Sequence, residues 1–295
     1  MRSPSFNLTI STTPLSPSAF EPFGEVIQNP ATHDEVDGNG QWRLQHQLAN
    51  QGTATKWVDV THLNNHYEKA WSKKPAKAVV NLFVCKPRVL TKDDNGREVF
   101  QVGIMERHPY TPQTFVPLGV GKEDGGNTRY LVIVAPTLPA TLRAKEERAD
   151  KPYPVDVPRA RKRSLKERLL GARPNPFTND YVPATKPTSS TTLPSSQRPK
   201  GSGLPDLKNI RAFIARGDQA LTYGPGTWHA PMVVLGEKSV EFVVVQYANG
   251  VGDEDCQECE LDAVDGDGIV VDVGRVDEVA QATDACKPGY MRAKL

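Results

Sequence analysis

The chain has 295 residues, of which 38% are hydrophobic, and its 36 Lys and Arg nearly balance its 35 Asp and Glu. That apolar content suffices for one substantial core. No apolar run approaches the ~20 residues that cross a bilayer, and the first residues lack the pattern of a secretory signal. Four scattered cysteines do not form the disulfide framework of a small secreted domain. We therefore expect an intracellular globular protein without a membrane role.

Short β-branched runs separated by turn residues fill most of the chain on both sides of residues 140–203. Their composition is typical of strands, and they are almost free of helical periodicity. The runs are residues 78–90, 97–108, 114–120, 129–136, 210–217, 219–226, 230–236 and 239–248. Eight such runs predict an all-β fold, an antiparallel β-barrel or jelly roll.

Residues 140–203 differ sharply from their surroundings. They contain 14 Lys or Arg against 6 Asp or Glu, nine prolines and a Ser/Thr cluster. Such a segment buries too little apolar surface to offset the entropy of ordering it, so we interpret it as a disordered insertion. Residues 159–171 can form a short basic helix. A solvated loop is favoured there over a nucleic-acid or membrane-surface role, because no aromatic residues are interleaved with the charges.

The insertion interrupts the sequence of a single domain. Residues 1–139 and 204–260 are predicted to form a single interrupted domain, because strand-like runs lie on both sides of the insertion. Residues 261–295 would be an extension, partly helical and packed outside the barrel. Cys256 and Cys259 form a lone CxxC without a second ligand pair, and a solvated acidic loop is preferred there over a zinc site.

Two of the six histidines stand in contexts that indicate chemistry. His108 follows Glu106 at strand spacing, so both side chains face the same side, and the apolar neighbours favour the barrel interior. Gln113 follows after a proline turn, and His229 comes directly after the glycine turn of GPGTWH. The imidazole of a histidine can bind a metal ion and can transfer a proton near neutral pH. The alternative is an internal Glu106–His108 hydrogen-bonded pair with His229 merely closing a turn. His33, His46, His62 and His66 are interpreted as exposed loop residues.

The spacing resembles the cupin pattern, with Glu106, His108 and Gln113 in the places of the first motif and His229 in the second. Two imidazoles, a carboxylate and an amide can bind a borderline divalent ion, but more weakly than three histidines. Longer strings are more specific. ERHPYTPQTFVPL, LPDLKNIRAFIARGDQALTYGPGTWHAPMVVLG and NQGTATKWVDV together resemble the ureidoglycolate lyase family, in its fungal form.

The resemblance implies a cupin-like barrel, a homodimer, and an amidine-type carbon–nitrogen lyase that splits (S)-ureidoglycolate into glyoxylate and urea. It further implies a divalent metal, nickel or similar, in bacterial relatives; Glu106 and Gln113 stand here where cupins carry a histidine and a glutamate. For this elimination we expect His229 to transfer protons with His108 or Glu106 as its partner. Lys56 would hold the substrate carboxylate. Asn50, Thr53 and Gln113 would bind its remaining polar groups.

Two other functions stay open at this point: a metal-dependent cupin oxygenase or isomerase, and a non-catalytic cupin that binds small carboxylates. The final Ala293-Lys294-Leu295 resembles a peroxisomal address, with a cytoplasmic location as the alternative.

Overall fold

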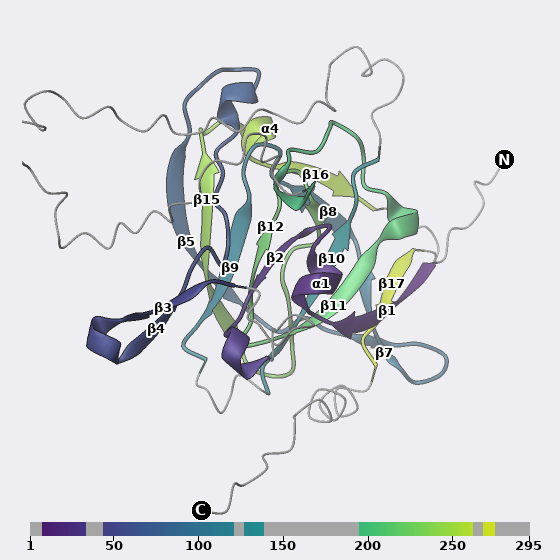
Figure 1. Ribbon diagram of the computed structural model, residues 1–295. Coiled ribbons are helices and arrows are strands. Elements are labelled where there is room, and N and C mark those ends of the chain that lie inside the picture. The colour runs from purple at the N-terminus through teal and green to yellow at the C-terminus, as the bar shows by residue number, and fades with distance from the viewer. Residues whose placement is uncertain (1–7, 34–43, 121–126, 139–194, 262–267, 275–295) are drawn as a thin grey trace, which may run out of the picture. The chain divides into compact units, whose positions relative to one another are not determined.

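The computed structural model describes residues 8–33, 44–120, 127–138, 195–261 and 268–274, and these are almost entirely β-structure (Figure 1). The strands are β1 (Leu8–Pro14), β2 (Gly24–Ile27), β3 (His46–Ala49), β4 (Ala54–Trp57), β5 (Lys77–Cys85), β6 (Thr91–Lys92), β7 (Glu98–Val102), β8 (Ile104–Arg107), β9 (Gln113–Leu118), β10 (Arg129–Ala135), β11 (Arg211–Arg216), β12 (Ala220–Tyr223), β13 (Trp228–His229), β14 (Val233–Leu235), β15 (Val240–Ala248), β16 (Gln257–Glu260) and β17 (Ile269–Asp272). The helices are α1 (Pro17–Phe20) and α4 (Gly252–Asp255), with single 3-10 turns at Pro30–Thr32, Asn50–Gly52, Tyr67–Lys69, Ser195–Gln197 and Leu207–Asn209. The all-β prediction is confirmed.

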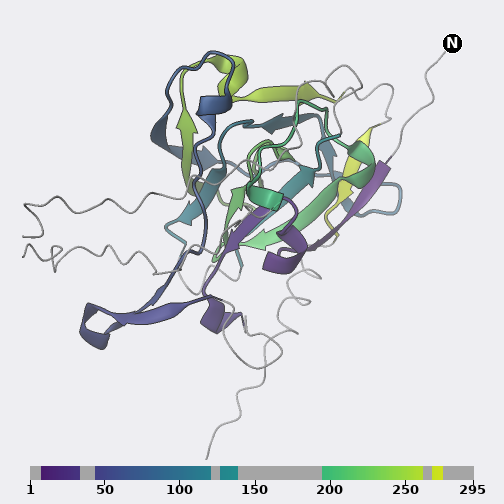
Figure 2. The same ribbon diagram turned by 45° about the horizontal axis from the view of Figure 1, so that its top comes forward.

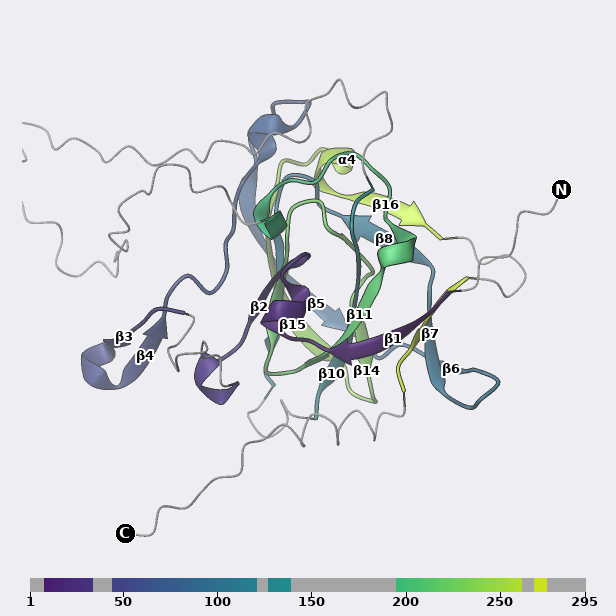
Figure 3. The same cartoon turned by 45° about the vertical axis from the view of Figure 1, so that its right-hand side comes forward.

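Two sheets carry most of these strands. One has the order β2-β12-β9-β15-β5, and all of its neighbours are antiparallel. The other follows the path β16-β8-β13-β10-β11-β1-β17-β7-β6, with β14 beside β10. Figures 1 and 3 show the larger sheet curling beside the smaller one, which is consistent with a cupin-like fold. Each of the eight predicted runs contains a strand.

Strand β10, in the interior of the larger sheet, explains why the core has two parts. All seven residues of β10 are buried, as its unbroken run of apolar side chains indicates. Successive side chains point to opposite faces, so Tyr130, Val132 and Val134 pack in the cluster that also holds Phe115 and Phe242 of the smaller sheet. Leu131, Ile133 and Ala135 pack instead with residues of β1, β7 and β17. The first cluster is the layer between the two sheets.

The two ends of the described chain meet in the larger sheet. β17 pairs in parallel with β1 and antiparallel with β7, and Ile269 and Val271 belong to the core. The expectation of a tail packed outside the barrel is therefore wrong for these residues, and two parallel pairings, β1 with β11 and with β17, break the expected antiparallel pattern. Residues 275–295, including the terminal Ala-Lys-Leu, lie outside the described part of the chain.

The last residues assigned to the insertion pack against the domain. Ser196 and Gln197 are buried, and the guanidinium of Arg107 donates hydrogen bonds to the carbonyls of Gly201 and Gly203. Burial lowers the pKa of Arg107 to about 10, and its guanidinium also stacks over Trp228. The predicted basic helix at residues 159–171 lies outside the described residues. Among the described helices, none is long and apolar enough to span a membrane.

The β3–β4 hairpin stands apart from both sheets. Its strands pair only with each other among the described strands. Figures 1 and 2 show it extending away from the five-stranded sheet. Its tight turn holds Asn50 and Gln51 at positive φ.

Candidate functional site

Strand pairing brings the two histidine-bearing segments together. β13 pairs with β8 so that His229 lies opposite Glu106, and His108 follows directly after β8. Met105 packs in the core on the other face of the sheet, as the alternation of a strand requires. Glu106 and His108 consequently share the face that carries His229, as the sequence predicts.

Three side chains converge closely enough to share one ion. A ligand atom from each of Glu106, His108 and His229 lies within 4.8 Å of the other two. His229 Nε2 is 3.5 Å from Glu106 Oε1, and the two imidazole rings are 5.7 Å apart between centroids. Both histidines are buried, whereas the side chain of Glu106 is 24% exposed. The group thus lies near the surface end of a buried layer.

Each histidine is held in one orientation by a backbone carbonyl. His108 Nδ1 is 2.6 Å from the carbonyl oxygen of Asp255, and His229 Nδ1 is 3.0 Å from that of Thr227. A ring nitrogen that faces a carbonyl must carry the proton, so both rings present an Nε2 lone pair when neutral. His108 Nε2 is buried without a hydrogen-bond partner among the described residues. This is how proteins orient metal-ligating or proton-accepting histidines.

Gln113 joins the same group from the neighbouring sheet. Its Nε2 donates to Gln246 Oε1 at 2.7 Å, which leaves its Oε1 3.1 Å from His229 Nε2. With the His229 proton on Nδ1, an oxygen acceptor and a nitrogen lone pair would face each other here. A proton or a cation between His229, Gln113 and Glu106 removes that conflict.

The pKa shifts within the group favour an ionised Glu106 and a neutral His108. Burial disfavours ionisation of Glu106, but its hydrogen bond to His229 and the charges of His229 and His108 keep the pKa of Glu106 below its ordinary value. Burial, helped by the neighbouring charge of His229, lowers the pKa of His108 to about 4. His108 is therefore a neutral acceptor at physiological pH, beside a carboxylate.

A second possible ligand group shares Glu106 with the first. Cys256 and Glu258 each bring a ligand atom within 4.8 Å of the Glu106 carboxylate. Burial and the charges of Glu106 and Glu258 raise the pKa of Cys256 to about 12, so its thiol stays protonated at neutral pH. Cysteine binds metals as the thiolate. Because the Cys256 thiol stays protonated, the histidine group is the better metal site.

The glycine turn before β13 sets the position of His229. Gly226 has φ +71°, a conformation that favours glycine, and its amide donates to the carbonyl of His108. Tyr223, just before the turn, stacks on the His229 imidazole at 3.9 Å between centroids and 10° between planes. The turn therefore ties the two histidine segments together through the backbone as well as through β-pairing.

The other predicted substrate ligands are not part of this group in the chain as described. Lys56, Asn50 and Thr53 belong to the β3–β4 hairpin, and Asn50 and Thr53 bond to each other across its turn. Lys56 lies in β4, whose only partner among the described strands is β3. Of the predicted substrate-binding residues, only Gln113 joins the histidines.

Several residues of the site region were not predicted correctly from the sequence. His66 is 6% exposed, so its assignment to an exposed loop is wrong. The segment with Cys256 and Cys259 is no solvated loop, because β16 pairs with β8 alongside the site. Gln246 and Asp255, which position Gln113 and His108, gave no signal because their partners are more than a hundred residues away in sequence.

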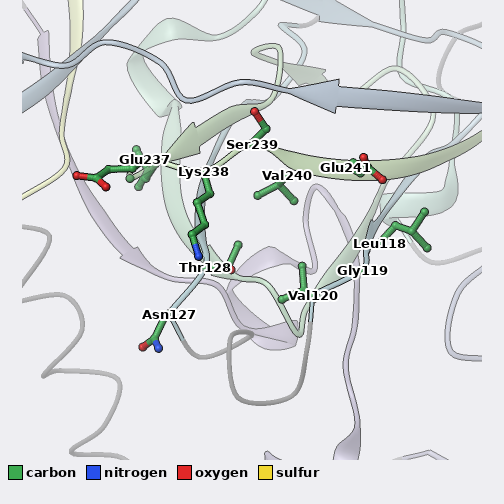
Figure 4. A pocket seen from close by; sticks show the side chains of 12 residues that line it. Leu118, Gly119, Val120, Asn127, Thr128, Glu237, Lys238, Ser239, Val240 and Glu241 are labelled. Carbon is green, nitrogen blue, oxygen red and sulfur yellow. The ribbon is translucent and has the colours of Figure 1, made fainter.

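A half-open cavity lies elsewhere in the fold. It has a volume of about 660 Å³ and lies between the end of β9 and the start of β15, with Asn127, Lys238 and Glu241 among its lining residues (Figure 4). Gln113 begins β9 and Leu118 ends it, roughly 17 Å away at the rise of an extended strand, so the cavity and the histidine group lie toward opposite ends of that strand. The lining residues of the cavity include Glu237, Lys238 and Glu241 but no histidine.

Comparison with known proteins assigns the chain to a family. A family model described as ureidoglycolate lyase matches residues 7–265, which includes every member of the histidine group. The chain belongs to the ureidoglycolate lyase family. The resemblance seen in the three sequence strings is thereby confirmed.

Individual relatives span most of the chain. A protein named ureidoglycolate lyase from Schizosaccharomyces pombe is 28% identical over 243 residues, 82% of this chain and 86% of the relative. One of the same name from Saccharomyces cerevisiae is 29% identical over 273 residues, 90% and 99% of the two chains. A bacterial protein of that name, from Burkholderia mallei, is 26% identical over 237 residues, 80% and 81% of the two.

Proposed function

We propose that this protein cleaves (S)-ureidoglycolate to glyoxylate and urea at the group formed by Glu106, His108, Gln113 and His229. The observation that carries the proposal is the convergence of two oriented imidazoles on an ionised carboxylate, within a chain of this family. Buried groups with shifted pKa values on one face are typical of catalytic sites. An oxygenase or isomerase finds no comparable support in the family match.

The elimination needs one proton removed and one delivered. The base takes the proton of the substrate hydroxyl, the electron pair forms the aldehyde C=O of glyoxylate, and the C–N bond breaks. The urea nitrogen then receives a proton, so no water is consumed. His229 Nε2 suits this transfer, and the carboxylate of Glu106, 3.5 Å away, stabilises the imidazolium formed between the two steps. His108, neutral and fixed by Asp255, accepts a hydrogen bond from the substrate.

The same atoms fit a divalent ion such as nickel. His108 Nε2, His229 Nε2, Glu106 Oε1 and Gln113 Oε1 would hold it, and the buried, unpartnered His108 nitrogen is the observation that favours it. When bound, such an ion would polarise the substrate oxygen as a Lewis acid. A ligating His229 has no free lone pair for proton transfer, so these two roles of His229 exclude each other.

A direct assay tests the proposal. The purified chain is incubated with (S)-ureidoglycolate, and glyoxylate is followed with and without a strong chelator, then after addition of Ni²⁺, Mn²⁺ or Zn²⁺. Activity that survives chelation supports proton transfer without a metal, which leaves His229 free for that role. Activity that is lost and restored by one ion assigns the group to metal binding. No glyoxylate under any condition would overturn the proposal.

We propose in addition that two copies form a homodimer through the outer face of the five-stranded sheet. Val80, Leu82 and Val84 of the edge strand β5 are more than half exposed, and they continue across the sheet to exposed Val116 and Leu118 of β9. Contiguous apolar patches of this kind mark interaction surfaces.

The projecting β3–β4 hairpin would then bring Lys56, Asn50 and Thr53 to the partner subunit. In this arrangement they keep the substrate-binding role expected from the sequence, with Lys56 pairing with the substrate carboxylate. The support is the hairpin's position outside both sheets, together with the apolar face beside it.

A further inference from the structure

Two buried side-chain nitrogens outside the histidine group, His66 Nε2 and Gln197 Nε2, have no hydrogen-bond partner among the described residues, as is also true of His108 Nε2. His66 is 6% exposed and Gln197 is fully buried. Leaving such an atom without a hydrogen bond costs roughly 1–3 kcal/mol, so native proteins keep it where a ligand or water completes it.

The chemical character of each atom is fixed by its neighbours. Asn64 Nδ2 donates to Gln197 Oε1 at 3.2 Å, so the unpartnered end of Gln197 is its NH₂ donor. The Gln197 backbone lies close enough to the His66 ring to raise its pKa, and in a neutral ring protonated on Nδ1 the unpartnered Nε2 is an acceptor. Burial and the charge of Lys69 lower the pKa of His66, which favours that neutral form. One donor and one acceptor thus come from neighbouring residues.

The pair is anchored to both loops that carry the histidine group. The amide of His66 donates to the carbonyl of Tyr110, in the loop between His108 and Gln113. On the other side, the carbonyl of Ser196 packs so closely on Gly224 that any side chain there would collide with it. Gly224 follows Tyr223, which stacks on His229. The segments of His66 and Gln197 therefore lie over the end of the sheets at which the catalytic histidines meet.

We propose that His66 and Gln197 recognise the ureido group of the substrate, an inference that rests on the lyase function proposed above. The terminal amide edge of a ureido group offers one carbonyl acceptor beside one NH₂ donor. The Gln197 NH₂ donates to that carbonyl, and His66 Nε2 accepts from that NH₂. A carboxylate offers two acceptors and no donor, so it does not match this pair. The pair would thus distinguish ureido acids from simple hydroxy acids and place the departing urea nitrogen toward His229.

Two substitutions remove one atom each while keeping the local anchors. His66→Asn retains a donor near the position of Nδ1 but lacks Nε2. Gln197→Glu retains the acceptor for Asn64 but replaces the NH₂ donor with an oxygen. His62→Asn, in a half-exposed side chain paired with Glu25, is the matched control. Melting temperatures within a few degrees of the unchanged protein establish that the variants are folded.

Calorimetry with two probes separates recognition from turnover. N-carbamoylglycine keeps the ureido and carboxylate groups but has no hydroxyl to eliminate, whereas glycolate has the hydroxyl and carboxylate without the ureido group. We expect Kd for N-carbamoylglycine to rise at least tenfold in each site variant, with glycolate binding within twofold and the control unchanged. With ureidoglycolate, KM should rise more than kcat falls, as for lost uniform binding.

Three results would overturn the inference: unchanged N-carbamoylglycine binding in both variants, an equal loss of glycolate binding, or no binding of N-carbamoylglycine to the unchanged protein. The first would assign the two atoms to a structural water. Because calorimetry needs no turnover, its result stays distinct from a failure of the lyase proposal, which would appear as absent glyoxylate in the unchanged protein.

Discussion

Replacement of His229 by Gln tests the assignment of proton transfer most sharply. Glutamine places an amide nitrogen or oxygen near the position of Nε2, so it preserves volume and the hydrogen bond at that position but cannot exchange a proton. We expect kcat to fall ~100-fold or more. That loss corresponds to about 2.7 kcal/mol of transition-state stabilisation, at about 1.36 kcal/mol for each tenfold change.

The structure also limits the effect of this substitution on folding. The variant loses the ring stacking on Tyr223, worth about 0.5–1.5 kcal/mol, and the hydrogen bond to Thr227, worth a similar amount. A loss of roughly 1–3 kcal/mol leaves a domain of typical stability folded. Thermal melts and far-ultraviolet circular dichroism check this before any kinetics.

Steady-state glyoxylate release, compared among the unchanged protein, His229→Gln and His62→Gln, gives the result. His62 is a histidine in a partly exposed ion pair with Glu25 and should leave kcat unaltered. A folded His229→Gln protein with kcat within threefold of normal would refute the reasoning, because the imidazole would then be dispensable for proton transfer.

Further predictions concern metal binding, stability and assembly. His108→Gln should weaken Ni²⁺ binding at least tenfold by calorimetry, and unchanged affinity would exclude His108 as a ligand. The hydrogen bond that His62 donates to Glu25 raises the pKa of His62, and His62 lowers that of Glu25 against its burial, so their pairing stabilises the fold most at pH 4.5–6.5 and is lost as pH rises through the His62 pKa. The free energy of unfolding, measured in urea, should differ less between pH 5.5 and pH 9 in His62→Gln than in the unchanged protein, by at most about 1 kcal/mol because His62 is partly exposed. The same pH dependence in the two proteins would contradict this. Leu82→Glu should yield monomers in light scattering and raise KM as much as Lys56→Ala does; a dimer, or an unchanged KM in either variant, would argue against the hairpin's role.

The histidine group was predictable because it depends on local patterns. The two-residue period of a strand places Glu106 and His108 on one face, and the glycine turn before His229 marks an abrupt change of chain direction. Both features can be seen in a dozen residues of sequence. The apolar runs likewise locate the strands that form the core.

The parts that were missed depend on contacts between distant segments. His66 looks exposed in NNHYEK, but in the fold it is buried beside the backbone of Gln197, more than a hundred residues away. β16 reads as an acidic loop because its strand character comes from pairing with β8. β17 is a short run near the end of the chain, and its place depends on β1 and β7.

The most direct measurement is product analysis by NMR on isotopically labelled (S)-ureidoglycolate mixed with the purified full chain. The account predicts glyoxylate and intact urea in equal amounts, with no ammonia, and no release above background in His229→Gln. Ammonia and carbon dioxide in place of urea would contradict the elimination, and intact substrate after prolonged incubation with each candidate ion would contradict the activity itself.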